Sequence, residues 1–99
     1  MAKSYMDERM EYLFKGILTL TSVEECRAFF EDLCTVKELS EMSRRLTAAK
    51  MLDENKIYTE IADATGLSTA TISRVNRCLK YGSDGYARVL ERLGAEAEQ

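Results

Sequence analysis

Residues 58–77, YTEIADATGLSTATISRVNR, have the pattern of two short helices that meet at a steep angle. Ala62 is small where such helices cross, and Gly66, four residues later, allows the positive φ that ends the first helix. Leu67 is expected to anchor the turn in the core, and Ser68 is a favourable N-cap for the second helix. Three apolar side chains should face inward and fix the angle: Ile61, Ile72 and Val75. The stretch therefore predicts a helix-turn-helix, which we place at residues 58–80.

The outward side of the second helix has the residue types that contact DNA. With the apolar positions inward, the face that remains consists of small and cationic side chains: Ser68, Thr69, Ala70, Thr71, Ser73, Arg74 and Arg77. Small hydroxyl side chains reach phosphates and base edges without clashing, and arginine binds guanine bidentately in the major groove. No acidic residue lies between Asp63 and Asp84, as expected for a surface that faces phosphates. We interpret this face as the DNA-binding surface; the alternative is a helical hairpin that only packs.

The charge of the chain is unevenly distributed. The 99 residues carry a net charge of −3, yet residues 43–81 contain seven basic and four acidic side chains, a net charge of +3. Phosphates respond to the local surface rather than to the total charge, so double-stranded DNA remains the expected partner. Within this block, Arg44, Arg45 and Lys50 form a solvated helix face with salt bridges, further phosphate contacts, or part of a pocket with Arg74.

The remainder of the chain also predicts helices. It contains no proline and five glycines, and it is rich in residues that favour helix, which indicates an all-α domain of six helices. Two amphipathic helices are expected in residues 1–34, a central helix and turn in 35–57, and a last helix in 84–99. Capping boxes mark two of the helix starts, Ser22 with Glu25 and Thr35 with Glu38. The first two helices can fold over the same chain or pack against a second copy, and periodicity does not choose between these.

Several classes of protein are disfavoured. The first eight residues are acidic and lack a signal-peptide pattern, and no stretch approaches 18 apolar residues, so we expect a cytoplasmic protein without a membrane contact. The chain has no histidine and no Gly-rich phosphate loop, which argues against an enzyme and against a metal site. Its three cysteines, Cys26, Cys34 and Cys78, are expected to be buried small hydrophobic residues.

The segment from Leu39 to Leu79 resembles the Trp repressor superfamily, and most closely its YerC/YecD-type branch. The matching residues are Ser43-Arg44, Thr59-Glu60-Ile61, Gly66-Leu67, Ala70-Thr71-Ile72-Ser73-Arg74 and Leu79-Lys80. The resemblance implies a single Trp-repressor-like domain over residues 1–99 and an intertwined homodimer whose N-terminal helices embrace the partner. It also implies that two recognition helices bind an operator about one DNA turn apart.

The resemblance further implies a place for an effector. In the members that bind tryptophan, two arginines hold the ligand, and they match Arg44 on the central helix and Arg74 in the recognition helix. The glycine that leaves room for the indole corresponds to Val75, whose β-branched side chain should fill that space. Tryptophan is therefore disfavoured as a corepressor, while a smaller or different amino acid, or no effector at all, stays open. No other cofactor is expected.

Two functions compete for these observations. The leading hypothesis is a sequence-specific transcriptional regulator, a repressor by resemblance, that binds the major groove as a homodimer. The alternative is a protein-interaction module that uses its helix-turn-helix to dock on a transcription component, and the overall acidity mildly favours it.

Overall fold

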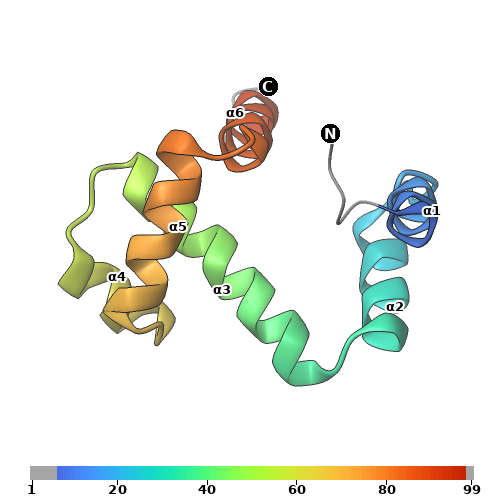
Figure 1. Cartoon of the computed structure of the whole chain (residues 1–99), viewed down its shortest axis with the longest axis horizontal. Coiled ribbons are helices and arrows are strands. Elements are labelled where there is room, and N and C mark those ends of the chain that lie inside the picture. The colour runs from blue at the N-terminus through green and yellow to red at the C-terminus, as the bar shows by residue number, and fades with distance from the viewer. Residues whose placement is uncertain (1–6, 98–99) are drawn as a thin grey trace. The chain divides into compact units, whose positions relative to one another are not determined.

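The computed structural model describes residues 7–97, and over these residues it contains six α-helices and no strand. Figure 1 shows the helices, which are α1 (Glu8–Ile17), α2 (Val23–Leu33), α3 (Val36–Asp53), α4 (Tyr58–Thr65), α5 (Thr69–Tyr81) and α6 (Gly85–Ala97). The predicted all-α, six-helix fold is confirmed. The chain divides into two compact units, the first ending at Leu39 and the second beginning at Ser40, with α3 running from one into the other.

Capping side chains define the starts of the helices in the first unit. The Ser22 hydroxyl accepts from the Glu25 amide at 3.1 Å, while the Glu25 carboxylate accepts from the amide of Thr21 at 2.9 Å, one residue earlier than in a regular capping box. The predicted box at Thr35 is complete, because the Glu38 amide donates to the Thr35 hydroxyl at 3.0 Å and the Thr35 amide donates to Glu38 at 2.9 Å.

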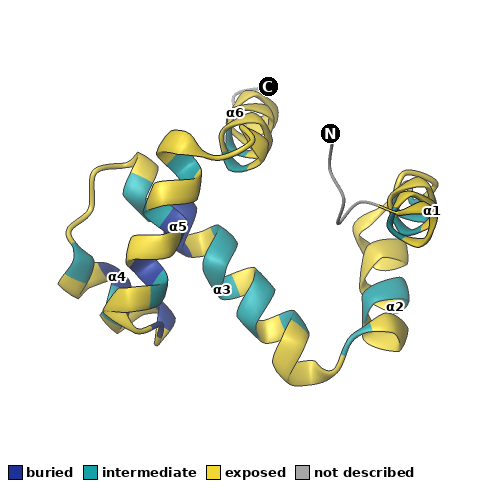
Figure 2. Cartoon of the chain, in the orientation of Figure 1, coloured by how far each residue is buried: buried dark blue, intermediate teal, exposed yellow. Residues whose placement is uncertain are grey.

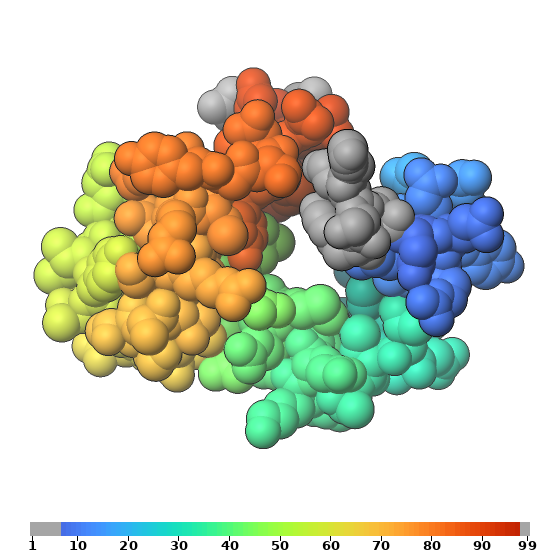
Figure 3. Space-filling model, in the orientation of Figure 1, coloured from blue at the N-terminus to red at the C-terminus, as the bar shows by residue number. Residues whose placement is uncertain are grey.

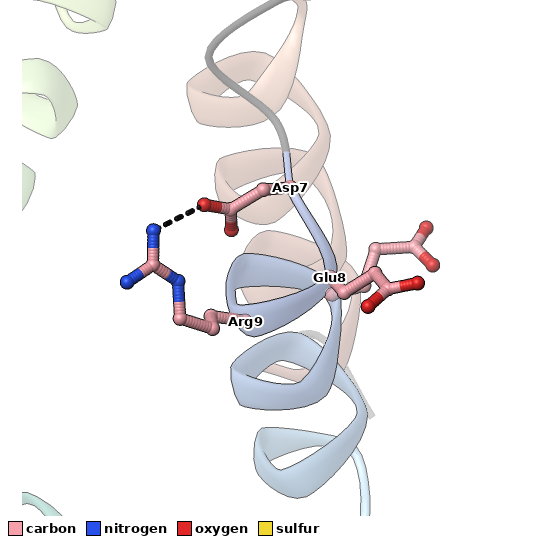
Figure 4. Close-up of a pocket in the computed structure, with 4 residues that line it drawn as sticks. Asp7, Glu8 and Arg9 are labelled. Carbon is pink, nitrogen blue, oxygen red and sulfur yellow. Dashed lines mark hydrogen bonds and ion pairs between the residues drawn. The ribbon is translucent and has the colours of Figure 1, made fainter.

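The start of α1 carries an ion pair between near neighbours. Asp7 is the N-cap and accepts from the Met10 amide at 3.0 Å, and its second carboxylate oxygen lies 2.8 Å from the Arg9 guanidinium. Figure 4 shows Asp7 and Arg9 facing each other on one side of the helix, with Glu8 pointing away from them. The bond to Arg9, followed by the bond from the Met10 amide, lowers the pKa of Asp7.

The first unit covers its apolar side chains only in part. Neither α1 nor α2 contains a buried residue, although both are amphipathic. Tyr12 is 82% exposed, Leu18 83% and Val23 72%, so these helices expose to solvent the side chains that ordinarily form a core.

The second unit has a compact hydrophobic core. It is built from six buried residues: Ala48, Ala49, Ile61, Leu67, Ile72 and Val75. Figure 2 shows the buried residues of the chain gathered on the end of α3, on α4 and on α5. Tyr86 and Leu90 of α6 pack against this core, as do Met51 and Leu52 of α3. Alanines at positions 48 and 49 have little side chain, so α4 and α5 can approach α3 closely at this point.

One sequence expectation needs correction. The cysteines do not belong to the core, because Cys26 and Cys78 are exposed and Cys34 is half-buried. The last helix, expected in residues 84–99, runs from Gly85 to Ala97 and continues through Gly94, because glycine weakens a helix without ending it. Over the described residues, no helix is long and apolar enough to cross a membrane.

Candidate nucleic-acid interface

The turn between α4 and α5 is held by hydrogen bonds within the residues 61–71. Helix α4 ends at Gly66, whose φ is +75° and whose amide donates to the Ala62 carbonyl at 2.8 Å. The buried Thr65 hydroxyl donates to the Ile61 carbonyl at 2.7 Å and accepts from the Leu67 amide at 3.2 Å. These bonds fix the backbone of residues 65–67. Gly66 ends α4 and Leu67 is buried, as predicted.

The start of α5 is capped by a side chain. The Ser68 hydroxyl accepts from the Thr71 amide at 3.1 Å, as predicted, and it also lies 3.1 Å from the Thr71 hydroxyl. The second contact turns Thr71 toward Ser68, and Thr71 is half-buried rather than fully outward. Ile72 and Val75 point into the core, with Ile72 fully buried and Val75 3% exposed. This packing sets which side of α5 faces solvent.

The outward face of α5 matches the predicted DNA-binding surface closely. Apart from Thr71, its predicted members are all exposed: Ser68, Thr69, Ala70, Ser73, Arg74 and Arg77. In the space-filling view the side chains of α5 lie at the front of the second unit (Figure 3). The two ion pairs among the described residues join Arg9 to Asp7 and Lys50 to Glu54, so no carboxylate neutralises Arg74 or Arg77 there. The face therefore presents free cations and small hydroxyl groups.

A cavity of about 360 Å³ lies beside this face, between α3, α5 and α6. Its walls contain two arginines, one acidic residue and several small or apolar side chains: Glu41, Met42, Arg45, Thr71, Arg74, Val75, Cys78 and Tyr86. Two guanidinium groups on one cavity favour an anionic group there. Val75 is buried against the core, and its side chain occupies space at the cavity wall.

The arginine that shares this cavity with Arg74 is Arg45. Arg44 lies elsewhere: its Nη1 donates to the Thr65 carbonyl at 3.4 Å, and its Nε donates to the Ser40 carbonyl at 3.4 Å. The pairing of Arg44 with Arg74 around an effector thus stays a prediction. The sequence named Arg45 only together with Arg44 and Lys50, and it assigned the effector contact to Arg44. The position of Arg45, four residues after Glu41, places both on one side of α3.

A larger cavity, of about 740 Å³, lies in the first unit and is lined by residues of α1, of α2 and of the turn between them. Among residues 7–97, no group of three or more potential metal ligands occurs. The acidic residues of the first turns of α1 and α2 are accounted for by their helix N-termini, where negative charge is favourable.

The comparison with protein families is decisive. The model of the Trp repressor protein family matches residues 8–94. The chain belongs to the Trp repressor family. It is 49% identical over 86 residues to the uncharacterized protein YerC of Bacillus subtilis, covering 87% of this chain and 83% of that protein.

Two solved structures have the same architecture. A TrpR-like protein from Eubacterium eligens aligns with a TM-score of 0.85 and 55% identity, over 89% of this chain and 91% of that one. A candidate Trp repressor from Staphylococcus aureus aligns with a TM-score of 0.86 and 46% identity, over 91% of this chain and 90% of that one. Membership in the Trp repressor family indicates a DNA-binding regulator, and the family is not one of enzymes.

Proposed function

We propose that this chain is a sequence-specific transcriptional regulator that acts in the cytoplasm as a homodimeric repressor and inserts α5 into the major groove. The observation that carries the proposal is the outward face of α5, which combines unpaired arginines with small hydroxyl side chains and no carboxylate. A helix face that is only solvated would be expected to include acidic residues, because the chain contains 17 of them. Repulsion between carboxylates and DNA phosphates explains why this face of α5 has none.

The position of each side chain along α5 assigns its role. Residues at the start of the helix, Ser68, Thr69 and Ala70, are small and lie where the helix N-terminus favours a phosphate. Arg74 and Arg77 are one turn apart on the exposed side and have the length to reach guanine edges or the backbone. Thr71 and Ser73 complete the surface. The Thr71 hydroxyl is hydrogen-bonded to Ser68, which restricts the DNA contacts that it can make.

A second copy of the chain is the occupant we propose for the apolar side of the first unit. A helix pair that buries no residue gains little from folding alone, because helices of this length are marginal without tertiary packing. Covering Tyr12, Leu18 and Val23 with the same surface of a partner would remove their side chains from water, and each fully buried apolar side chain contributes about 1.5–3 kcal/mol. A homodimer also presents two copies of α5, as a palindromic operator requires.

We place any small-molecule effector of this regulator in the cavity beside Arg74. Arg45 and Arg74 would hold its carboxylate, and the buried Val75 would exclude a ligand as wide as an indole. An amino acid smaller than tryptophan fits this description, and we expect tryptophan itself to give no saturable thermal stabilisation.

DNA binding is tested by selecting genomic fragments with the purified protein and titrating the best fragment at several salt concentrations. Arg77→Ala should cost about 1–3 kcal/mol if the side chain reads a base, or lower the salt slope by about one if it contacts a phosphate. Arg92→Ala, which removes an exposed arginine from α6, is the matched control and should change affinity little. Absence of binding to every fragment at low salt would contradict the proposal.

The second candidate function, docking on a transcription component, is favoured by the net charge of −3. It predicts that Arg77→Ala weakens a protein complex and leaves binding to DNA fragments absent or unspecific. Titration of the selected DNA fragments with the wild-type protein and with Arg77→Ala therefore distinguishes the two functions.

A further inference from the structure

We propose that Arg44 is a positioning residue that holds the turn of the helix-turn-helix from the neighbouring helix α3. Its guanidinium closes the end of α4 and so fixes the angle at which α5 leaves the turn. The effect on DNA binding rests on the proposed function, whereas the effect on the turn itself does not.

The contacts of Arg44 converge on the end of α4. Nη1 donates to the Thr65 carbonyl at 3.4 Å, and the same nitrogen would lie 3.5 Å from a Cβ built on Gly66. Nε donates to the Ser40 carbonyl one turn earlier on α3, which orients the guanidinium toward the turn. Arg44 is half-buried and forms no ion pair with the carboxylates of residues 7–97. Its positive charge is thus directed at backbone carbonyls.

Helix α4 has a particular need for this charge. The last carbonyls of a helix lack partners within the helix and carry the negative end of its dipole, so a cation near them is favourable. The last turn of α4 contains no basic residue of its own, and the helix is eight residues long. Arg44 supplies from α3 the cation that α4 does not contain. The geometry therefore separates two adjacent arginines, with Arg45 on the cavity and Arg44 on the turn.

The test uses Arg44→Met, which retains an apolar stem but removes every donor. Without DNA, amide hydrogen exchange measured by NMR should be about two- to fivefold faster at Gly66 and Leu67, the factor that corresponds to one cation at a helix C-terminus. Lys50→Met, which removes a positive charge from the exposed side of the same helix, should leave those two amides unchanged. Arg44→Lys should restore part of the protection, since the charge returns without the second donor.

The DNA titration separates positioning from direct contact. Arg44→Met should weaken binding by no more than the factor seen in exchange, because only the population of the binding-competent turn changes. The slope of log affinity against log salt should stay at the wild-type value, since Arg44 neutralises no phosphate. A slope lowered by about one, as for loss of a phosphate contact, would overturn the proposal.

Exchange at Gly66 and Leu67 that is equal in Arg44→Met and the wild-type protein would also overturn it, whatever the DNA affinity. If the wild-type protein binds no DNA, the proposed function fails, and the exchange measurement still decides the role of Arg44.

Discussion

Replacing Gly66 by alanine tests whether the turn between α4 and α5 depends on backbone conformation or on space. Gly66 has a φ of +75°, the left-handed region that L-residues rarely adopt. A Cβ at this position would meet the Arg44 guanidinium at 3.5 Å, an ordinary van der Waals contact, so no steric clash adds to the cost. The change in the free energy of unfolding caused by Gly66→Ala therefore reflects the left-handed conformation and not a steric clash.

The expected magnitude follows from two opposing effects. A residue with a Cβ in the left-handed conformation costs about 1–2 kcal/mol relative to glycine. Alanine also restricts the unfolded chain, which returns about 0.4–1 kcal/mol of stability. The net destabilisation should be about 1 kcal/mol, which lowers Tm by about 4–8 °C in a domain of this size.

Thermal unfolding followed by circular dichroism, at one fixed protein concentration, measures this difference. Two other glycines provide controls with different expected results. Gly94→Ala in α6, where a Cβ meets nothing within 4 Å, should stabilise the protein by about 0.5–1 kcal/mol. Gly82→Ala should destabilise it more than Gly66→Ala, because a Cβ there overlaps the backbone carbonyl of Cys78. A Gly66→Ala protein as stable as the wild type would refute the reasoning.

Three further outcomes are expected. Ile72→Ala, which truncates a fully buried side chain of the core, should lower the free energy of unfolding by about 2–5 kcal/mol in urea denaturation. The side chain of Leu18 is 83% exposed in the single chain. Leu18→Glu should shift the mass measured by light scattering from twice 11.2 kDa toward 11.2 kDa. A mass that stays at that of the dimer would show that Leu18 is not in the interface. The pKa of Asp7 is lowered in the folded state, so the carboxylate stabilises α1 above the ordinary aspartate pKa, and this stabilisation should be lost as the pH falls through the folded pKa. NMR chemical shifts of α1 followed against pH measure this loss. A profile that does not change with pH would contradict it.

The helix-turn-helix could be predicted from the sequence because its determinants are local. Gly66, Ser68 and the spacing of Ile61, Ile72 and Val75 all lie within residues 61–75, and the structure confirms each of them. The half-buried position of Thr71 was missed, although it lies four residues before the buried Val75 and so on the same side of α5.

Features that depend on distant contacts could not be predicted. Which of two adjacent arginines lines the cavity depends on the rotation of α3 relative to α5 and α6, and this rotation is set by packing at Ala48 and Ala49. The exposure of the cysteines was mispredicted because residue type alone favoured burial, whereas Cys26 and Cys78 lie on exposed sides of α2 and α5. The first unit fully buries no residue of α1 or α2, and the periodicity of a sequence indicates only that a face is apolar.

The chemical composition of the α5 face also has a consequence for how its affinity responds to conditions. Serine, threonine and arginine side chains keep the same charge from acid to alkaline pH, and the 99 residues contain no histidine, the side chain that ordinarily titrates near neutrality. The electrostatic potential of this face is therefore fixed across physiological pH. Ionic strength, and not proton concentration, should tune its attraction for a polyanion.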